Sequence, residues 1–130
     1  MSDHYELARM PITTDRWHTH YGWSEHEAQE FGDSSWEVRI FACSESYRRE
    51  LEADTAGTFE FGYGGSGPHD AARAILADRG VDLTQWSPAD LRTFLPEVFE
   101  RDDDRGYTTL SIPTADIDRR LSLVGIQVQS

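Results

Sequence analysis

Residues 59–76, FEFGYGGSGPHDAARAIL, decide the fold class, because a short aromatic alternation leads through a glycine-rich turn into an amphipathic helix. Every second residue over Phe59–Tyr63 is aromatic, which is the period of a strand with one buried face. The turn Gly62–Gly67 ends that strand, since glycine adopts backbone torsions that other residues avoid. A helix is then predicted to begin near Pro68, because proline is favoured at the first helical position.

The helix predicted after the turn has an apolar stripe and a clear end. Arg79 places a positive charge in its last turn, and Gly80 is typical of the glycine that ends a helix. The stripe consists of Ala71, Ala72, Ile75 and Leu76. We therefore expect this helix to pack one face against the predicted strands.

Two further helices are predicted, and each has a proline near its first position. Ser87 is the expected N-cap of the second helix, in which Pro96 removes a backbone hydrogen bond and produces either a kink or two short helices. Pro113 opens the third helix, which turns Ile117 and Leu121 inward. The apolar positions of the second helix are Leu91, Phe94, Leu95, Val98 and Phe99.

Two other stretches alternate in the manner of strands. Over Trp36–Ala42 the even-numbered residues are apolar, and we expect them to face the core. Alternate residues over Val124–Val128 repeat the pattern and predict a C-terminal strand. The intervening stretch Tyr47–Leu51 is ambiguous, since its spacing suits either a helical turn or one arm of a hairpin.

Residues 1–35 form a polar, histidine-rich segment, in which the short alternation at Tyr5 and Leu7 indicates a strand start. No long apolar period follows, so we expect the segment to be rich in loops. Ser24 and Glu27 have the spacing of a capping box, which predicts a short helix over Ser24–Phe31. Residues 36–130 are predicted to form a single α+β domain, in which a small antiparallel sheet is followed by about three helices and a C-terminal strand. The sequence leaves open whether the N-terminal segment packs on this domain.

The composition excludes several classes of function. The 130 residues include 24 Asp and Glu against 12 Lys and Arg, a formal net charge of −12. Duplex DNA, RNA and anionic membranes bind proteins through basic surfaces, so none of them is expected as a direct partner. No stretch approaches the ~18 apolar residues of a membrane span and no signal peptide is recognisable, so we expect a cytoplasmic protein. A single cysteine, Cys43, excludes an internal disulfide.

All twelve basic residues are arginine. A GC-rich genome is one explanation, because its codon bias favours arginine over lysine. A halophilic host is the other, because carboxylates stay hydrated in strong salt and the net repulsion is screened there. The second explanation covers the acidity more fully, and it predicts that the fold loosens when salt is removed.

The segment Phe59–Pro68 and the helix after it resemble the signature F-x-[WF]-G-Y-x-G-S-G-P of a small family of uncharacterised phage, plasmid and prokaryotic proteins. The resemblance spans about residues 36–123, and Gly62–Pro68 is its specific part. Phe61 stands where the family more often has tryptophan, and His69 stands where small or amide residues are usual. The resemblance implies the fold and a viral or mobile-element setting, and it implies no chemistry.

The glycine turn has two interpretations. Its backbone N–H groups, next to a helix N-terminus, suit a phosphate or a nucleotide. Alternatively, glycine is needed only for a tight reversal, which is favoured because the spacing matches neither nucleotide-binding glycine motif and Asp70 is expected in the first helical turn. The candidate ligand-binding residues are Gly64, Gly65, Ser66 and Gly67. On the conformational interpretation, we expect one of the last three glycines to have a positive φ.

His18 and His20 lie on one side of the chain if the segment is extended, and His26 follows, so these three are a candidate zinc or nickel ligand set. The alternative is a polar surface segment that binds no metal. Cys43 is expected to be a small residue at a strand end. The many carboxylates define no acid–base pair and Ser66 is not in a nucleophile-elbow motif, so no catalytic residue is assigned.

These observations predict a non-enzymatic accessory protein of a virus or mobile element that binds a host or viral protein. Its acidity suits a basic nucleic-acid-binding groove, so that a defence inhibitor acting as a DNA mimic is one form of this function. Two alternatives stay open. One is a small-ligand or nucleotide binder that uses Gly62–Pro68, and the other is a metal-dependent enzyme that uses His18, His20 and His26. The oligomeric state is left open.

Overall fold

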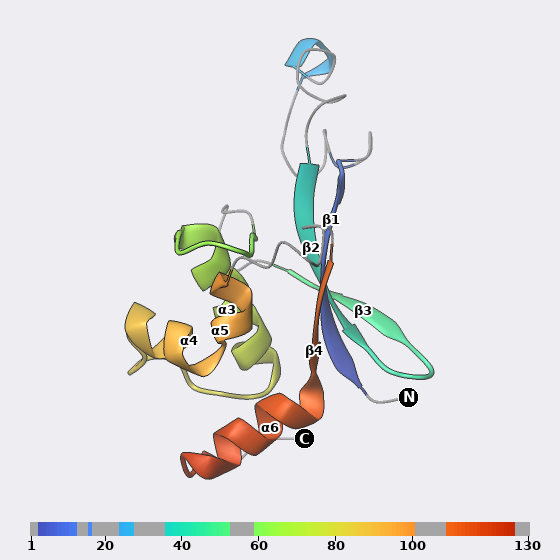
Figure 1. Ribbon diagram of the computed structural model, residues 1–130. Helices are drawn as coiled ribbons and strands as arrows, with labels where there is room; N and C mark the ends of the chain where they lie inside the picture. Colours follow the sequence, from blue (N-terminus) through green and yellow to red (C-terminus); the bar gives the residue numbers. More distant parts are fainter. Residues whose placement is uncertain are drawn as a thin grey trace.

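Four strands form one antiparallel sheet within the described residues, which are 3–12, 16, 24–27, 36–52, 59–100 and 109–126 of this computed structural model (Figure 1). The strand order is β3-β2-β1-β4, so β1 and β2 are the inner strands. Their bounds are β1 His4–Pro11, β2 Trp36–Cys43, β3 Arg48–Leu51 and β4 Thr109–Pro113. The ambiguous stretch before residue 52 is therefore a hairpin arm, β3, and not a helical turn.

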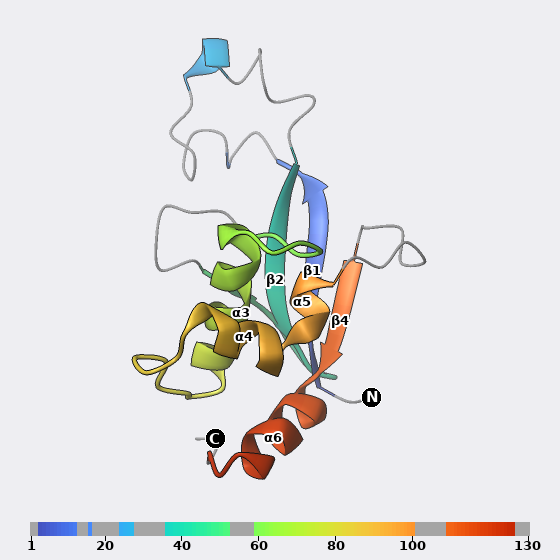
Figure 2. The ribbon, with the colours of Figure 1, turned by 60° about the vertical axis from the view of Figure 1, so that its left-hand side comes forward.

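The main helices lie on one face of this sheet. Figures 1 and 2 show α3, α4 and α5 over that face, with α6 continuing from β4 at one end of the sheet. Their bounds are α3 Ser66–Asp78, α4 Pro88–Phe94, α5 Pro96–Phe99 and α6 Thr114–Leu123. The α+β class expected from the sequence is confirmed.

The N-terminal part of the chain contributes a central strand, which corrects the expectation of a loop-rich segment over residues 1–35. β1 pairs with β2 over its whole length, from His4 opposite Cys43 to Pro11 opposite Trp36, and it pairs with β4 on its other side. β1 therefore belongs to the same sheet as β2 and β4, which lie within the domain expected over residues 36–130.

The apolar alternation of β1 breaks at Arg9, which explains why the sequence did not predict the strand. Tyr5 and Leu7 are buried against the helices, but Arg9 takes the next inward position. Its guanidinium lies 2.6 Å from the carboxylate of Glu60 and 4.6 Å from the ring centre of Phe61. A charged residue is thus held at the edge of the core by an ion pair and a cation–π contact.

The core lies between the sheet and the helices. It includes the predicted stripe of α3, whose four apolar residues are all fully buried. The largest fully buried side chains include Tyr5, Leu7, Ile40, Ile75, Leu76, Leu91, Leu95, Ile112, Ile117 and Leu121. Trp36, which was expected to face inward, is 58% exposed at the end of β2. In the part of the chain described, no helix has the length and apolarity needed to cross a membrane.

The local signals for the second and third helices are confirmed. The Ser87 side chain accepts the backbone N–H of Asp90, and the Asp90 carboxylate accepts the N–H of Ser87, which completes a capping box. Pro96 divides the predicted helix into α4 and α5. In α6, Ile117 and Leu121 are buried as expected. These features depend on residues only a few positions apart.

The strand predicted over Phe59–Tyr63 is reduced to one bridge, between Phe59 and Val38 of β2. The chain leaves the sheet after that bridge, because the N–H of Gly62 donates to the carbonyl of Val98 in α5 at 2.7 Å. Phe59 nevertheless belongs to the core. Phe61 is buried as well, whereas Tyr63 is 51% exposed, so the aromatic alternation reports burial at its first two positions and not continued strand pairing.

The end of the chain also differs from the expected order. Val124 and Gly125 form a turn after α6, and residues 127 and 128 of the predicted terminal strand lie outside the described residues. The last described strand is β4, which precedes the final helix. A short helical turn is present at residues 25–27, where Glu27 donates its N–H to Ser24 Oγ at 3.2 Å. The remainder of that predicted helix, up to Phe31, is outside the described residues.

Candidate functional site

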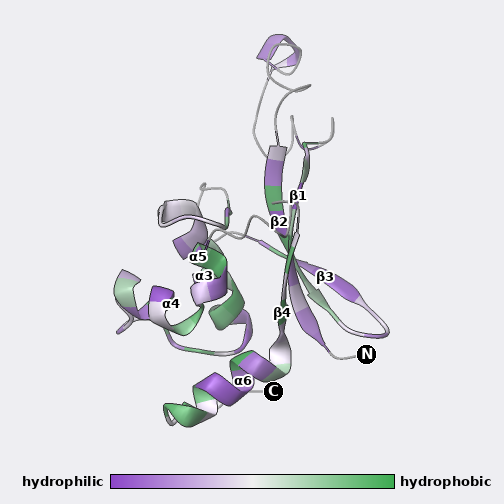
Figure 3. Ribbon diagram, viewed as in Figure 1, coloured by the Kyte–Doolittle hydropathy of each residue, from purple (hydrophilic) through white to green (hydrophobic). Residues whose placement is uncertain are grey.

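The face of the sheet opposite the helices, which we call the open face, is lined mainly by polar and charged side chains. Successive residues of a strand point to opposite sides, so the register determines which residues share this face. They are His4, Glu6, Ala8 and Met10 of β1, Glu37, Arg39, Phe41 and Cys43 of β2, Arg48 and Glu50 of β3, and Thr109, Ser111 and Pro113 of β4. Figures 1 and 2 show no described helix over it, and Figure 3 shows β3 as largely hydrophilic.

Phe41 is buried on the open face because two arginines cover it. Its ring is only 8% exposed, with the guanidinium of Arg48 at 3.8 Å and that of Arg39 at 5.3 Å from the ring centre. Arg39 donates two hydrogen bonds to Glu50, which raise the pKa of Arg39 above its usual value. Arg48 lies 2.8 Å from Glu6. Each guanidinium is therefore held between an aromatic ring and a carboxylate.

Ion pairing of this kind extends over the described surface. Eight of the ten described arginines lie within ion-pair distance of a described carboxylate. The pairs are Arg9–Glu60, Arg16–Glu37, Arg39–Glu50, Arg48–Glu6, Arg49–Asp78, Arg79–Asp118, Arg119–Asp116 and Arg120–Glu97. Most of the described positive charges are thus neutralised by a neighbouring carboxylate, and the described residues form no unpaired basic patch. Because the chain has more carboxylates than arginines, its overall electrostatic potential is negative.

One carboxylate of the network is deeply buried. Glu37 is 5% exposed, and Arg16 donates two hydrogen bonds to it, from Nε at 2.6 Å and from a terminal nitrogen at 2.5 Å. A buried carboxylate is costly unless such partners offset its desolvation. This pair joins Arg16, from the segment before β2, to the sheet.

On the helix face, Tyr5 and Asp78 connect β1 to the end of α3. The Tyr5 hydroxyl donates to Asp78 at 2.5 Å, and Arg49 of β3 lies 2.9 Å from the same carboxylate. Burial, followed by the hydrogen bond to Asp78, raises the pKa of Tyr5 above its usual value. The neutral phenol is therefore the form that the fold stabilises.

The glycine turn has one conformationally demanding position. The φ of Gly62 is 95°, whereas Gly64, Gly65 and Gly67 have no positive φ, so the expectation for those three is wrong. Gly62 is the point at which the chain bends away from β2 towards α5, held by the hydrogen bond to Val98. A positive φ there explains why glycine is required.

Helix α3 begins two residues before Pro68, at Ser66, with Gly65 as its N-cap. Asp70 therefore lies beyond the first turn, which corrects the expectation that it neutralises the helix N-terminus. Gly67 is buried and Ser66 is exposed. Arg92 of α4 donates to the carbonyl of Gly64 at 3.1 Å. The structure thus brings the four candidate ligand-binding residues together at one helix end, and anion binding there stays a prediction.

The histidines expected to bind metal are not tested as a set. His18 and His20 lie outside the described residues, and His26 is exposed on the short helical turn. The structure does place His69 in the first turns of α3, with Nδ1 2.7 Å from the carbonyl of Gly65. Its ring packs edge-on against Phe99, with ring centres 4.8 Å apart.

A different group of metal-binding residue types does come together, at His4, Glu6 and Cys43. Sequence reasoning treated these residues as unrelated. The His-x-Glu spacing on a strand was the available signal, but β1 was not predicted, and only its pairing with β2 brings Cys43 to the same place.

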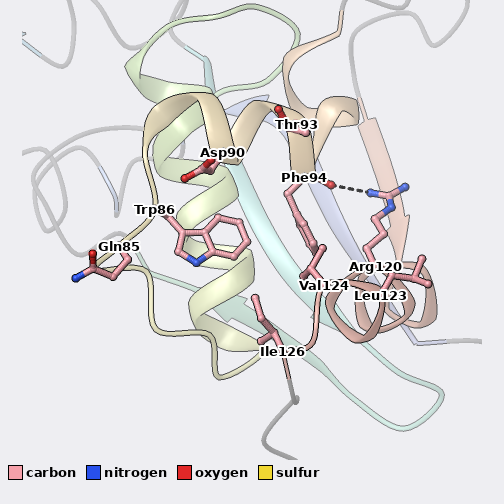
Figure 4. Close-up of a pocket in the computed structure, with 9 residues that line it drawn as sticks. All are labelled: Gln85, Trp86, Asp90, Thr93, Phe94, Arg120, Leu123, Val124 and Ile126. Atoms are coloured by element: carbon pink, nitrogen blue, oxygen red, sulfur yellow. Dashed lines mark hydrogen bonds between the residues drawn. The ribbon is translucent and has the colours of Figure 1, made fainter.

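A mostly apolar pocket of about 580 Å³ opens between α4, the loop before it and α6 (Figure 4). Trp86 and Phe94 form one part of its wall, with ring centres 5.4 Å apart. Leu123 and Val124 lie across from them and are 80% and 61% exposed. Arg120, at the edge, donates to the Phe94 carbonyl. Figure 3 shows the end of α6 as hydrophobic, so the pocket continues into an exposed apolar rim.

No protein-family profile, curated protein or solved structure matches this chain.

Proposed function

We propose that this protein is a non-enzymatic accessory protein of a virus or mobile element that acts by binding a basic, nucleic-acid-binding surface of a host or viral protein. The observation that carries the proposal is the pairing of eight of the ten described arginines with carboxylates. Because the cations are neutralised locally, a chain with a net charge of −12 presents an acidic field to its surroundings. The phage and plasmid setting implied by the Gly62–Pro68 signature supports the same proposal.

The sign of this field selects the class of partner. A phosphate backbone is repelled, whereas a surface rich in Lys and Arg is attracted, and the attraction falls as salt screens it. A partner whose basic groove normally binds DNA would therefore be occupied by carboxylates in place of phosphates. Inhibition of such a partner follows without any catalytic step.

The apolar pocket supplies the second element of recognition. Charges steer an encounter, but affinity depends more on a few apolar anchors in well-packed pockets. Trp86 and Phe94 offer aromatic walls, and the exposed Leu123 extends them. Asp90 lines the same pocket, and Asp82 belongs to the adjoining loop. We infer a partner surface in which basic side chains surround one apolar side chain.

Affinity capture followed by titration tests the proposal. Tagged protein is incubated with an extract of the organism that carries the gene, at low and at higher salt, and the captured protein is then purified. We expect a nucleic-acid-binding protein that is lost at the higher salt. Recovery of no basic protein at either salt would refute the proposal. A nucleotide retained on the purified chain would instead favour the Gly62–Pro68 turn as a small-ligand site.

Paired variants then locate the binding surface. Asp82→Asn with Asp90→Asn removes two charges but keeps the acceptor oxygens that bond Thr84 and Ser87. We expect this variant to slow association by about two- to tenfold. The matched control, Glu25→Gln with Glu52→Gln, makes the same charge change at two other exposed carboxylates and should have a smaller effect.

The pocket has its own pair of variants. Leu123→Ser should speed dissociation, because it removes an exposed apolar side chain from the pocket rim. Tyr47→Ser is the control, since Tyr47 is 55% exposed in the chain segment before β3. Equal effects of the two substitutions would exclude the pocket from the interface.

A further inference from the structure

Three metal-binding side chains meet on the open face, at the end of the β1–β2 pair. His4 and Glu6 are two residues apart on β1, so they point to the same side, and Cys43 of β2 is the direct cross-strand partner of His4. One ligand atom of each, an imidazole nitrogen, a carboxylate oxygen and the sulfur, lies within 4.8 Å of the other two. The three residues lie on β1 and β2, the two inner strands, which pair with each other over their whole length.

We propose that His4, Glu6 and Cys43 form a zinc-binding site. Nitrogen, oxygen and thiolate ligands are those that Zn²⁺ takes, and in tetrahedral coordination neighbouring ligand atoms are about 3.3–3.7 Å apart. The Nε2 of His4 lies 4.0 Å from Oε2 of Glu6, longer than a hydrogen bond and close to that separation. Side-chain rotations that move the ligand atoms by about 1 Å therefore bring them to three coordination positions of one zinc ion. A water molecule takes the fourth position.

The carboxylate is already oriented for this role. Arg48 lies 2.8 Å from Oε1 of Glu6 and is itself packed on the ring of Phe41, so that Oε2 is the oxygen turned towards His4. Hydrogen-bonded partners of this kind commonly fix metal-ligating carboxylates. Once the Cys43 thiol has released its proton to solvent, thiolate and carboxylate together balance the two charges of Zn²⁺.

The site lies at one end of the β1–β2 pair. It would join the beginning of β1 to the end of β2, where the sheet lacks a covering helix among the described residues. The proposal is independent of partner binding. It also differs from the ligand set expected from sequence, since it uses none of His18, His20 and His26.

Titration with Zn²⁺ and Co²⁺ tests the site. Full-length protein is treated with a chelator, dialysed, and titrated with Zn²⁺ against a chromophoric competitor and with Co²⁺ under reducing conditions. We expect one equivalent of either ion, an intense near-ultraviolet band from a thiolate–cobalt bond, and a rise in the unfolding temperature on adding Zn²⁺. The absence of one-equivalent binding would overturn the proposal.

Variants assign the ligands. Cys43→Ser should abolish the thiolate–cobalt band, and both Cys43→Ser and His4→Ala should weaken Zn²⁺ binding by about 100-fold or more, beyond the loss typical of outer-shell changes. His26→Ala is the matched control and should bind as the parent does. Metal-free unfolding curves check that the variants fold, and Glu6→Gln provides a third, nearly isosteric variant if one does not. Binding that survives Cys43→Ser and His4→Ala but is lost when His18 and His20 are replaced would overturn the assignment.

Discussion

Replacing Gly62 with alanine should destabilise the fold, because the φ of Gly62 is 95°, a torsion that L residues rarely adopt. An added Cβ would meet nothing closer than the Glu100 carbonyl oxygen at 4.0 Å, so the cost comes from backbone conformation and not from crowding. Holding a non-glycine residue at such a torsion costs about 1–3 kcal/mol. The lower flexibility of alanine in the unfolded chain recovers about 0.4–1 kcal/mol, which leaves a net loss of about 1–2 kcal/mol.

Gly64→Ala is the matched control in the same turn. Gly64 has no positive φ, and its added Cβ would lie 3.3 Å from the flexible end of Arg92, which can move. We expect its free energy of unfolding to change by no more than about 0.5 kcal/mol. Urea unfolding followed by tryptophan fluorescence measures the free energy of unfolding of both variants. In thermal unfolding, Gly62→Ala should lower the melting temperature by about 3–8 °C. If the two variants unfold together, the torsion at Gly62 is not demanding and the explanation of the turn is refuted.

Three further predictions concern stability. Arg16→Gln should lower the free energy of unfolding in urea by about 3–5 kcal/mol, because it removes the cation that pairs with the buried Glu37. Adding Glu37→Gln to this variant should recover part of the loss. Strictly additive losses for the two substitutions would contradict the pairing. The pKa of Tyr5 is raised in the folded protein, so its neutral phenol contributes to the free energy of unfolding. This contribution is fully present below about pH 10, where tyrosine of the unfolded chain ionises, and is lost as the pH rises further. Tyr5→Phe should flatten this alkaline decline in urea unfolding, and an unchanged decline would exclude Tyr5 as its source. Removing salt should lower the melting temperature, since the net charge of −12 is then unscreened, and a melting temperature independent of salt would argue against adaptation to a salt-rich host.

The parts of the fold that the sequence predicted are those encoded by neighbouring residues. The capping box at Ser87, the division of a helix at Pro96 and the buried stripe of α3 each depend on side chains within one or two turns. The end of α3 before Gly80, whose φ is 82°, belongs to the same class. Such signals do not depend on tertiary contacts, so they can be recognised in the sequence alone.

The features that were not predicted depend on contacts distant in the sequence. β1 was not predicted because Arg9 interrupts its apolar alternation, and this inward charge is tolerated because Glu60 and Phe61 lie beside it in the fold. The aromatic run beginning at Phe59 was interpreted as a full strand, because burial of Phe59 and Phe61 in the core produces the same alternation as strand pairing.

The candidate sites follow the same division. The four residues Gly64–Gly67 were found because glycine clusters are visible in sequence, although the demanding torsion lies at Gly62. The His4, Glu6 and Cys43 group requires the β1–β2 register, which sequence alone did not provide. The pocket between α4 and α6 likewise exists only once Trp86 and Leu123 are brought together.

We propose that the acidic surface of this protein occupies the nucleic-acid-binding face of a basic partner. The most direct measurement is a competition titration, in which this protein is added to the purified captured partner bound to fluorescently labelled duplex DNA. We expect the DNA to be displaced at low salt and the displacement to weaken as salt is raised, and we expect this protein alone to retain no DNA. Saturable binding of the DNA by this protein alone, or a complex in which the partner keeps its DNA, would contradict the proposed binding mode.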